Sequence, residues 1–150
     1  MDVSKELVEI ADMYLAGKKS AAELLAVIAT DIDQDRISLG KISFTPASTN
    51  FDSGSLFFRT KESTFIVEHL KLALTPKTTL SLSDLNKYWG EFRKVPTGPD
   101  RLRHNYAFLK VLKPEYQYSG YINVRLSAPV DTPDSKVVTI MIRRDPISKA

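Results

Sequence analysis

The residues with the clearest spacing for chemistry are three aspartates near the end of the first quarter of the chain. Asp31, Asp33 and Asp35 stand at alternate positions, as the first three ligands of an EF-hand calcium loop do. That loop also needs glycine at its sixth position and a bidentate glutamate at its twelfth, where this chain has Arg36 and Ile42. We therefore expect an acidic loop that ends a helix and no metal site, with weak calcium binding as the alternative.

Acid–base and nucleophilic catalysis have few candidate residues. The chain has two histidines, His69 and His104, and no cysteine. It contains no GxSxG or HExxH motif and no paired-carboxylate motif, and neither phosphate-binding glycine pattern occurs. We therefore expect a non-catalytic protein without a metal or cofactor. An enzyme or small-ligand binder with a pocket between a helix and a sheet is the alternative.

A basic segment follows the only tryptophan, and aromatic residues stand at its ends. Such a mixture could follow a nucleic-acid backbone and stack bases. Glu91 and Asp100 dilute the charge, and no RNP-like or helix-turn-helix signature accompanies it. Nucleic-acid binding is therefore disfavoured, although a nucleic-acid-associated regulator stays a third alternative. The basic residues are Arg93, Lys94, Arg101, Arg103 and His104.

Tyrosines after this segment suggest a surface for protein recognition. Eight of the 14 aromatic residues lie between positions 88 and 121. Tyr116 and Tyr118 fall in an expected turn, and tyrosine and arginine are frequent in binding hot spots. We predict a partner-binding surface of Tyr116, Tyr118, Arg101 and Arg103, suited to an acidic partner. The competing surface is the acidic cluster Asp31, Asp33 and Asp35, suited to a basic partner.

Composition is that of an ordinary globular chain, and its charge is unevenly distributed. The 150 residues are 43% hydrophobic and 26% charged, which predicts one domain over residues 1–150. Residues 1–75 carry a net charge of −3 and residues 76–150 carry +6. No apolar run is long enough for a membrane span, and the acidic N-terminus lacks signal-peptide features. We expect a cytoplasmic protein that does not bind membranes, although a chain from which a leader had been removed would read the same way.

Three helices are expected from apolar spacing and capping residues. Val3–Leu15 has a helical apolar stripe that Gly17 ends, and Ser20 with Glu23 forms a capping-box pattern for a second helix. The short turn between them predicts a helical hairpin. A third, short helix in Ser81–Phe92 should end at the glycine beside Trp89, and because it is short it must pack on a sheet.

Strands are expected where the apolar period changes to two. They are consecutive along the chain rather than alternating with helices, which predicts an α+β fold with an antiparallel sheet of about five to six strands. Pro46–Gly54 reads as a polar loop. The expected strands are Ile37–Phe44, Ser55–Thr60, Thr64–Leu74, Tyr106–Leu112, Tyr121–Ala128 and Val137–Arg144.

The run TLSLSDLNKYWGEF (Thr79–Phe92), followed by strands containing GYINVRL and KVVTIMIRR, resembles small α+β immunity proteins of bacterial toxin systems. The helix-then-glycine pattern is also similar to BamE-like and beta-lactamase-inhibitor domains. The resemblance covers about half of the chain. It implies a compact, non-catalytic protein that binds and neutralises one cognate toxin, and it transfers no binding residues. The partner's identity and the oligomeric state stay open.

Overall fold

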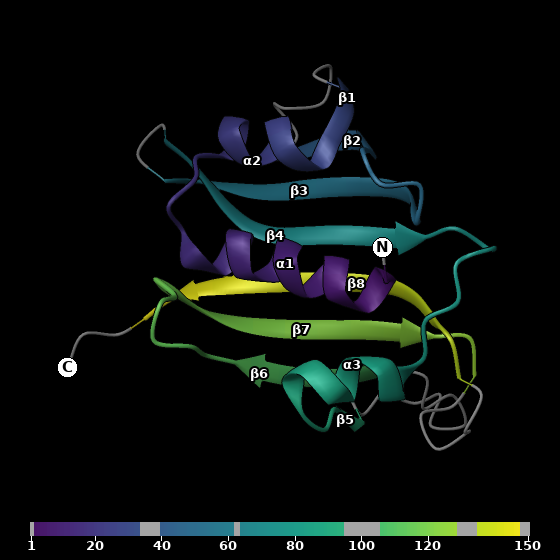
Figure 1. Ribbon diagram of the computed structural model, residues 1–150. Helices are drawn as coiled ribbons and strands as arrows, with labels where there is room; N and C mark the ends of the chain where they lie inside the picture. The colour runs from purple at the N-terminus through teal and green to yellow at the C-terminus, as the bar shows by residue number, and fades with distance from the viewer. Residues whose placement is uncertain (1, 34–39, 62–63, 95–105, 129–134, 148–150) are drawn as a thin grey trace, which may run out of the picture.

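The computed structural model describes residues 2–33, 40–61, 64–94, 106–128 and 135–147. Its helices and strands follow one another as two helices, four strands, one helix and four strands (Figure 1). The elements are α1 Val3–Ala16, α2 Ala21–Ile28, β1 Ala29–Asp33, β2 Lys41–Pro46, β3 Phe51–Lys61, β4 Thr64–Leu74, α3 Leu82–Trp89, β5 Arg93–Lys94, β6 Tyr106–Val111, β7 Tyr118–Leu126 and β8 Val137–Pro146.

The eight strands form one antiparallel sheet in the order β1-β2-β3-β4-β8-β7-β6-β5. Each half of the chain forms a four-stranded meander, and the two meanders join where β4 pairs with β8. The predicted α+β class with an antiparallel sheet is confirmed, whereas the predicted five to six strands are too few. The central pair, β4 and β8, comes from the two halves of the sequence.

The sequence predicts too few strands because two of them lack a clear apolar alternation. β1 contains Asp31 and Asp33, so the expected acidic loop is wrong over these residues, which pair with β2. β5 has only two residues, which pair with β6. In addition, β3 begins at Phe51, within the segment that was expected to be a loop.

The helix ends follow the capping residues. Asp2 caps α1, which ends at Gly17 with a left-handed φ of 73°. Ser20 and Glu23 form the predicted capping box of α2. Ser81 and Asp84 form another at α3, where each side chain accepts a bond from the other's backbone N–H. The predicted helices and the helical hairpin are confirmed.

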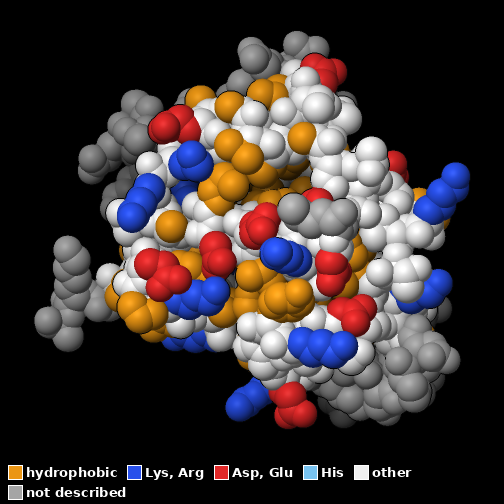
Figure 2. Space-filling model, viewed as in Figure 1, with side chains coloured by type: hydrophobic (Ala, Val, Ile, Leu, Met, Phe, Trp, Pro, Cys, Tyr) orange, Lys and Arg blue, Asp and Glu red, His pale blue; other side chains and the backbone are white. Residues whose placement is uncertain are grey.

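All three helices lie on one face of the sheet (Figure 1). α1 lies over the central strands and runs along them, α2 returns beside it over the N-terminal meander, and α3 lies over the C-terminal meander (Figure 1). Figure 2 shows this helix-covered side, where hydrophobic side chains are exposed between acidic and basic ones. Because the helices need an apolar surface, the strands turn their aliphatic side chains towards them.

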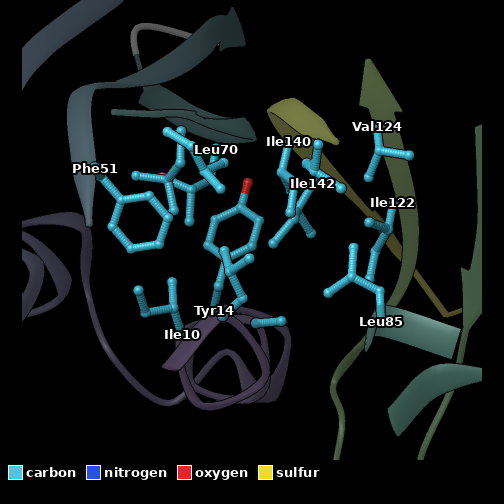
Figure 3. Packing of buried hydrophobic residues seen from close by; sticks show 14 of the residues in the cluster. Ile10, Tyr14, Phe51, Leu70, Leu85, Ile122, Val124, Ile140 and Ile142 are labelled. Carbon is cyan, nitrogen blue, oxygen red and sulfur yellow. The ribbon is translucent and has the colours of Figure 1, made fainter. Parts of the chain in front are cut away.

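The hydrophobic core lies between the helices and this face of the sheet. Ile10 and Tyr14 of α1 point towards Leu70, Ile140 and Ile142 of the central strands (Figure 3). Tyr14 is 1% exposed, and the three strand residues are fully buried. Full burial of one such aliphatic side chain contributes roughly 1.5–3 kcal/mol.

A close contact between β2 and β3 explains one glycine of the core. Gly54 pairs with Phe44, and a Cβ added at Gly54 would lie 2.3 Å from the Phe44 ring. No real Cβ approaches a carbon atom so closely. The absence of a side chain at position 54 therefore makes room for the buried ring of Phe44.

α3 is held to the sheet chiefly by leucines. Leu85 is fully buried and Leu82 is 9% exposed. Trp89, the largest side chain of the helix, is only partly buried, with its ring 6.2 Å from that of Phe92. The predicted packing of this short helix on the sheet is correct, but the tryptophan contributes only part of it.

Candidate binding face

The face of the sheet opposite the helices is the strongest candidate for a functional surface. We call it the outer face and define it by three rows of paired residues that cross the strands. The first row is Lys41, Phe57, His69, Arg143, Tyr121 and Lys110; the second is Ser43, Ser55, Lys71, Met141, Asn123, Phe108 and Arg93; the third is Ser53, Ala73, Thr139, Arg125 and Tyr106. All of these side chains are exposed or half-exposed.

In the first row, cations alternate with rings. The Lys41 Nζ lies 5.6 Å from the centre of the Phe57 ring, and Phe57 meets His69 edge to face at 6.3 Å. Tyr121 has the Arg143 guanidinium 4.6 Å and the Lys110 Nζ 5.7 Å from its ring centre. Such cation–π contacts, worth roughly 0.5–1 kcal/mol at exposed sites, hold the charges over the sheet.

The second and third rows form a shallow hollow of about 250 Å³. Lys71 and Arg125 supply two cations to its lining, and Asn123 and Thr139 supply uncharged hydrogen-bonding groups. Tyr106, which is 39% exposed, forms part of the wall. The hollow therefore offers donors and positive charge to an anionic group.

The outer face has a strong excess of positive charge. From β2 to β5 the three rows contain six Lys or Arg residues and no Asp or Glu, whereas on β1 the second row continues to Asp33, which pairs with Ser43. The nearest carboxylate along β8 is that of Asp145, whose Oδ2 lies 3.1 Å from an Arg143 nitrogen. Since like charges gathered on one surface attract an oppositely charged partner, this face favours an acidic ligand.

The predicted acidic surface lies at the edge of the sheet. Asp31 is exposed on β1, opposite Thr45, and its carboxylate accepts a bond from the backbone N–H of Ile32. On the same strand, Asp33 pairs with Ser43 of β2. Asp35, like Arg36, lies outside the described residues, so the structure describes the cluster only in part.

The predicted exposure of Tyr116 is wrong. Its ring is 5% exposed, and its hydroxyl donates a hydrogen bond to Asp12 of α1. Lys113 donates to the same carboxylate at 2.9 Å. Burial, followed by the hydrogen bond to Asp12, raises the pKa of Tyr116 above its ordinary value of 10.0. Tyr116 therefore fastens the β6–β7 connection to α1.

Tyr118 lies on the helix-covered side at the start of β7. The guanidinium of Arg144 lies 4.5 Å from the ring centres of both Tyr118 and Tyr14, and it donates to the Tyr14 carbonyl at 2.9 Å. A Cβ at Gly17 would lie 2.6 Å from the Tyr118 ring. Because Tyr118 packs among these groups, it is half-buried and not a free turn residue.

The other two residues of the predicted basic surface, Arg101 and Arg103, lie outside the described residues, as does His104. His69 lies on the exposed side of β4, as expected for a histidine of a strand surface. Of the four residues predicted for this surface, the structure therefore describes only Tyr116 and Tyr118, which pack against groups of the helix-covered side. Instead, a different set of cations and rings gathers on the outer face.

Sequence reasoning missed this face although part of its signal is visible. Tyr121, Asn123 and Arg125 alternate with buried residues of β7, and Thr139, Met141 and Arg143 alternate with buried residues of β8. The period of two indicates that each triplet shares a face. What the sequence does not contain is the register that places Arg143 between His69 and Tyr121.

No protein family, curated protein or solved structure matches this chain. Among the described residues, no three His, Asp or Glu side chains gather as a metal ion would require. Within the same residues, no helix combines the length and apolar character of a membrane span.

Proposed function

We propose that this chain is a non-catalytic binding protein whose outer face recognises an acidic surface of a protein partner. The observation that carries the proposal is the outer face itself, where the rows from β2 to β5 hold six cations and no carboxylate, and the acidic residues Asp31 and Asp33 lie on the edge strand β1. The described helices lie on the opposite side of the sheet (Figure 1). The partner's acidic residues would be steered towards these cations.

The residue types of the outer face favour a protein partner. Tyrosine, arginine, phenylalanine and methionine are enriched in protein interfaces. Tyr121, Arg143 and Met141 lie next to one another on paired strands. A regular sheet fixes their backbone, so binding would cost little ordering entropy.

A cognate bacterial toxin is the partner that we propose. This part of the proposal is based on the resemblance of Thr79–Phe92 and the following strands to immunity proteins. An immunity protein of this kind would block its toxin by direct contact. The outer face would then meet an acidic patch on the toxin, and the toxin's active site would be covered by the same contact.

Single-stranded nucleic acid is a second candidate, and the first row favours it. There, Phe57 and Tyr121 lie beside Lys41, Arg143 and Lys110. Rings that stack bases and cations that contact phosphates are the usual parts of such a site. The rows lack the helix-in-groove geometry that reads duplex DNA.

Two probes separate these candidates. We would measure the binding of a poly-L-glutamate peptide and of an oligothymidine of equal charge by fluorescence anisotropy at two salt concentrations. Peptide binding should be about tenfold weaker in the double variant Lys110→Glu/Arg143→Glu, because two attractive contacts become repulsive. Tighter binding of the oligothymidine would favour the second candidate.

The matched control reverses two charges on the helix-covered side. Lys18→Glu/Lys87→Glu changes the net charge equally at exposed positions. If this control weakens peptide binding as much as the outer-face variant, only overall charge matters and the proposed surface is wrong. The product of a neighbouring gene is the first candidate toxin, and its binding should be measured with the same two double variants.

A further inference from the structure

A groove opens on the helix-covered side, between α1, α2 and the connection from β2 to β3. Its volume is about 180 Å³, and its walls are largely apolar. Val27, which is 50% exposed, stands at its edge, while Phe51 and Leu72 belong to the buried core beneath it. Figure 2 shows hydrophobic side chains exposed over this part of the molecule. The groove therefore reaches from the surface to the core.

Two carboxylates line this apolar groove. Glu6 and Glu9 stand on α1 three residues apart, so they share one side of the helix. The Oε1 atom of Glu6 is buried and has no hydrogen-bond partner among the described residues. A buried polar atom left without a partner costs roughly 1–3 kcal/mol, and more when it is charged. Because this atom is closed to water, the Glu6 side chain would have to rotate before a donor in the groove could remove this cost.

We propose that the groove binds a short alkylammonium ion, with the ammonium group at Glu6 and the alkyl chain along Ile10, Met13 and Val27. An ammonium group supplies three donors and the charge opposite to that of Glu6 and Glu9. A volume of 180 Å³ is far larger than the roughly 10–15 Å³ that one water molecule needs on the same measure, so the groove can hold a small ligand. A four-carbon primary amine fits this space.

The chemistry of the walls excludes two other ligand classes. An alkyl carboxylate would place its charge against two like charges, which is unfavourable in an apolar groove. An alcohol would gain the same apolar contacts, but it brings one O–H donor and no charge, whereas an ammonium group brings three donors and a positive charge opposite two carboxylates. Selectivity for the amine over the alcohol is therefore the signature of the site.

The groove lies on the opposite side of the sheet from the outer face. Its occupant is therefore independent of the acidic partner proposed above. Failure of one proposal leaves the other unchanged.

Amide chemical shifts measured by NMR would test the site with butylammonium chloride, 1-butanol and sodium butyrate. Butylammonium should move the signals of Ile10, Met13 and Ile28 saturably and bind at least about tenfold tighter than 1-butanol. Equal affinity for the amine and the alcohol, or no saturable shift, would overturn the proposal.

Two variants and one further ligand complete the test. Glu6→Gln should reduce the preference for the amine to less than about threefold, whereas Glu91→Gln, at an exposed carboxylate outside the groove, should leave it unchanged. Val27→Trp should block the groove and prevent binding, and this variant tests the site even if Glu6→Gln does not fold. An unchanged preference in Glu6→Gln or unchanged binding in Val27→Trp contradicts the site. Tighter binding of an N-capped lysine amide would assign the groove to a protein side chain instead.

Discussion

The two faces of the sheet use the same strands for different purposes. In β7, Ile122 and Val124 are fully buried under the helices, while Tyr121, Asn123 and Arg125 alternate with them on the outer face. The buried positions carry aliphatic side chains that fit one another closely. The outer positions carry cations, rings and amides that no described helix covers.

This contrast separates stability from recognition. A buried aliphatic side chain contributes through the water that it excludes, so its loss leaves a cavity. An exposed side chain on the outer face, such as that of Asn123 or Arg125, keeps much of its hydration, and its replacement usually changes stability by less than about 0.5 kcal/mol. The outer face is therefore free to be specialised for a partner without loss of the fold.

Ile142→Ala should have the largest effect. Ile142 is fully buried on β8 between Leu70 and Ile122, so truncation should lower the free energy of unfolding by about 4 kcal/mol. Its neighbour Arg143 faces outwards, and Arg143→Ala should cost less than about 1 kcal/mol. Urea denaturation measures both variants. Similar losses would contradict the division between the two faces.

Gly54→Ala should destabilise by about 2 kcal/mol, because the new methyl group would overlap the ring of Phe44. Ser55→Ala, one residue further along β3 and on the outer face, is the control and should cost less than about 0.5 kcal/mol. Thermal or urea denaturation gives both values. The double variant Phe44→Leu/Gly54→Ala should be less destabilised than the sum of its single changes, and full additivity would exclude the overlap.

Tyr121→Ala should weaken binding of the acidic peptide about tenfold, equal to 1.4 kcal/mol, because its ring holds Arg143 and Lys110. Tyr121→Phe keeps the ring and should keep most of the affinity. Anisotropy titrations compare the two variants. If both lose affinity equally, the hydroxyl and not the ring is what the partner contacts.

Ser81→Ala should destabilise by about 1 kcal/mol through loss of the capping box of α3. Ser81→Asp retains an acceptor for the N–H of Asp84 and is the matched control. The measurement is the urea midpoint of each variant. Equal midpoints for wild type and Ser81→Ala would show that packing of Leu82 and Leu85 alone fixes this helix.

Tyr14→Phe should have the smallest effect, a gain of up to about 1 kcal/mol, because the buried Tyr14 hydroxyl has no hydrogen-bond partner among the described residues. Burial raises the pKa of Tyr14 above its ordinary value of 10.0. The stability that wild type holds below pH 10 should therefore decline as the pH rises above it, since the unfolded chain releases the proton first. Denaturation between pH 8 and pH 11 should show a shallower decline in Tyr14→Phe, and an identical decline would contradict this assignment.

Sequence patterns predicted local features well and the burial of Tyr116 poorly. The caps Ser20 and Ser81 and the terminator Gly17 act within a few residues, so their effect is visible in the sequence. Tyr116 illustrates the failure. Its position suggested an exposed turn, but its hydrogen-bond partner, Asp12, is 104 residues away. No local pattern could indicate that contact.

By itself, the sequence determined the helix ends, the α+β class and the alternation within β7 and β8, because capping bonds and the strand period are local properties. Only the tertiary structure decided the pairing of β4 with β8 and the side on which the helices lie. Those two choices bring His69, Arg143 and Tyr121 into one row of the outer face. They depend on closing a long stretch of chain between the strands, whose entropic cost is repaid only when the whole core assembles.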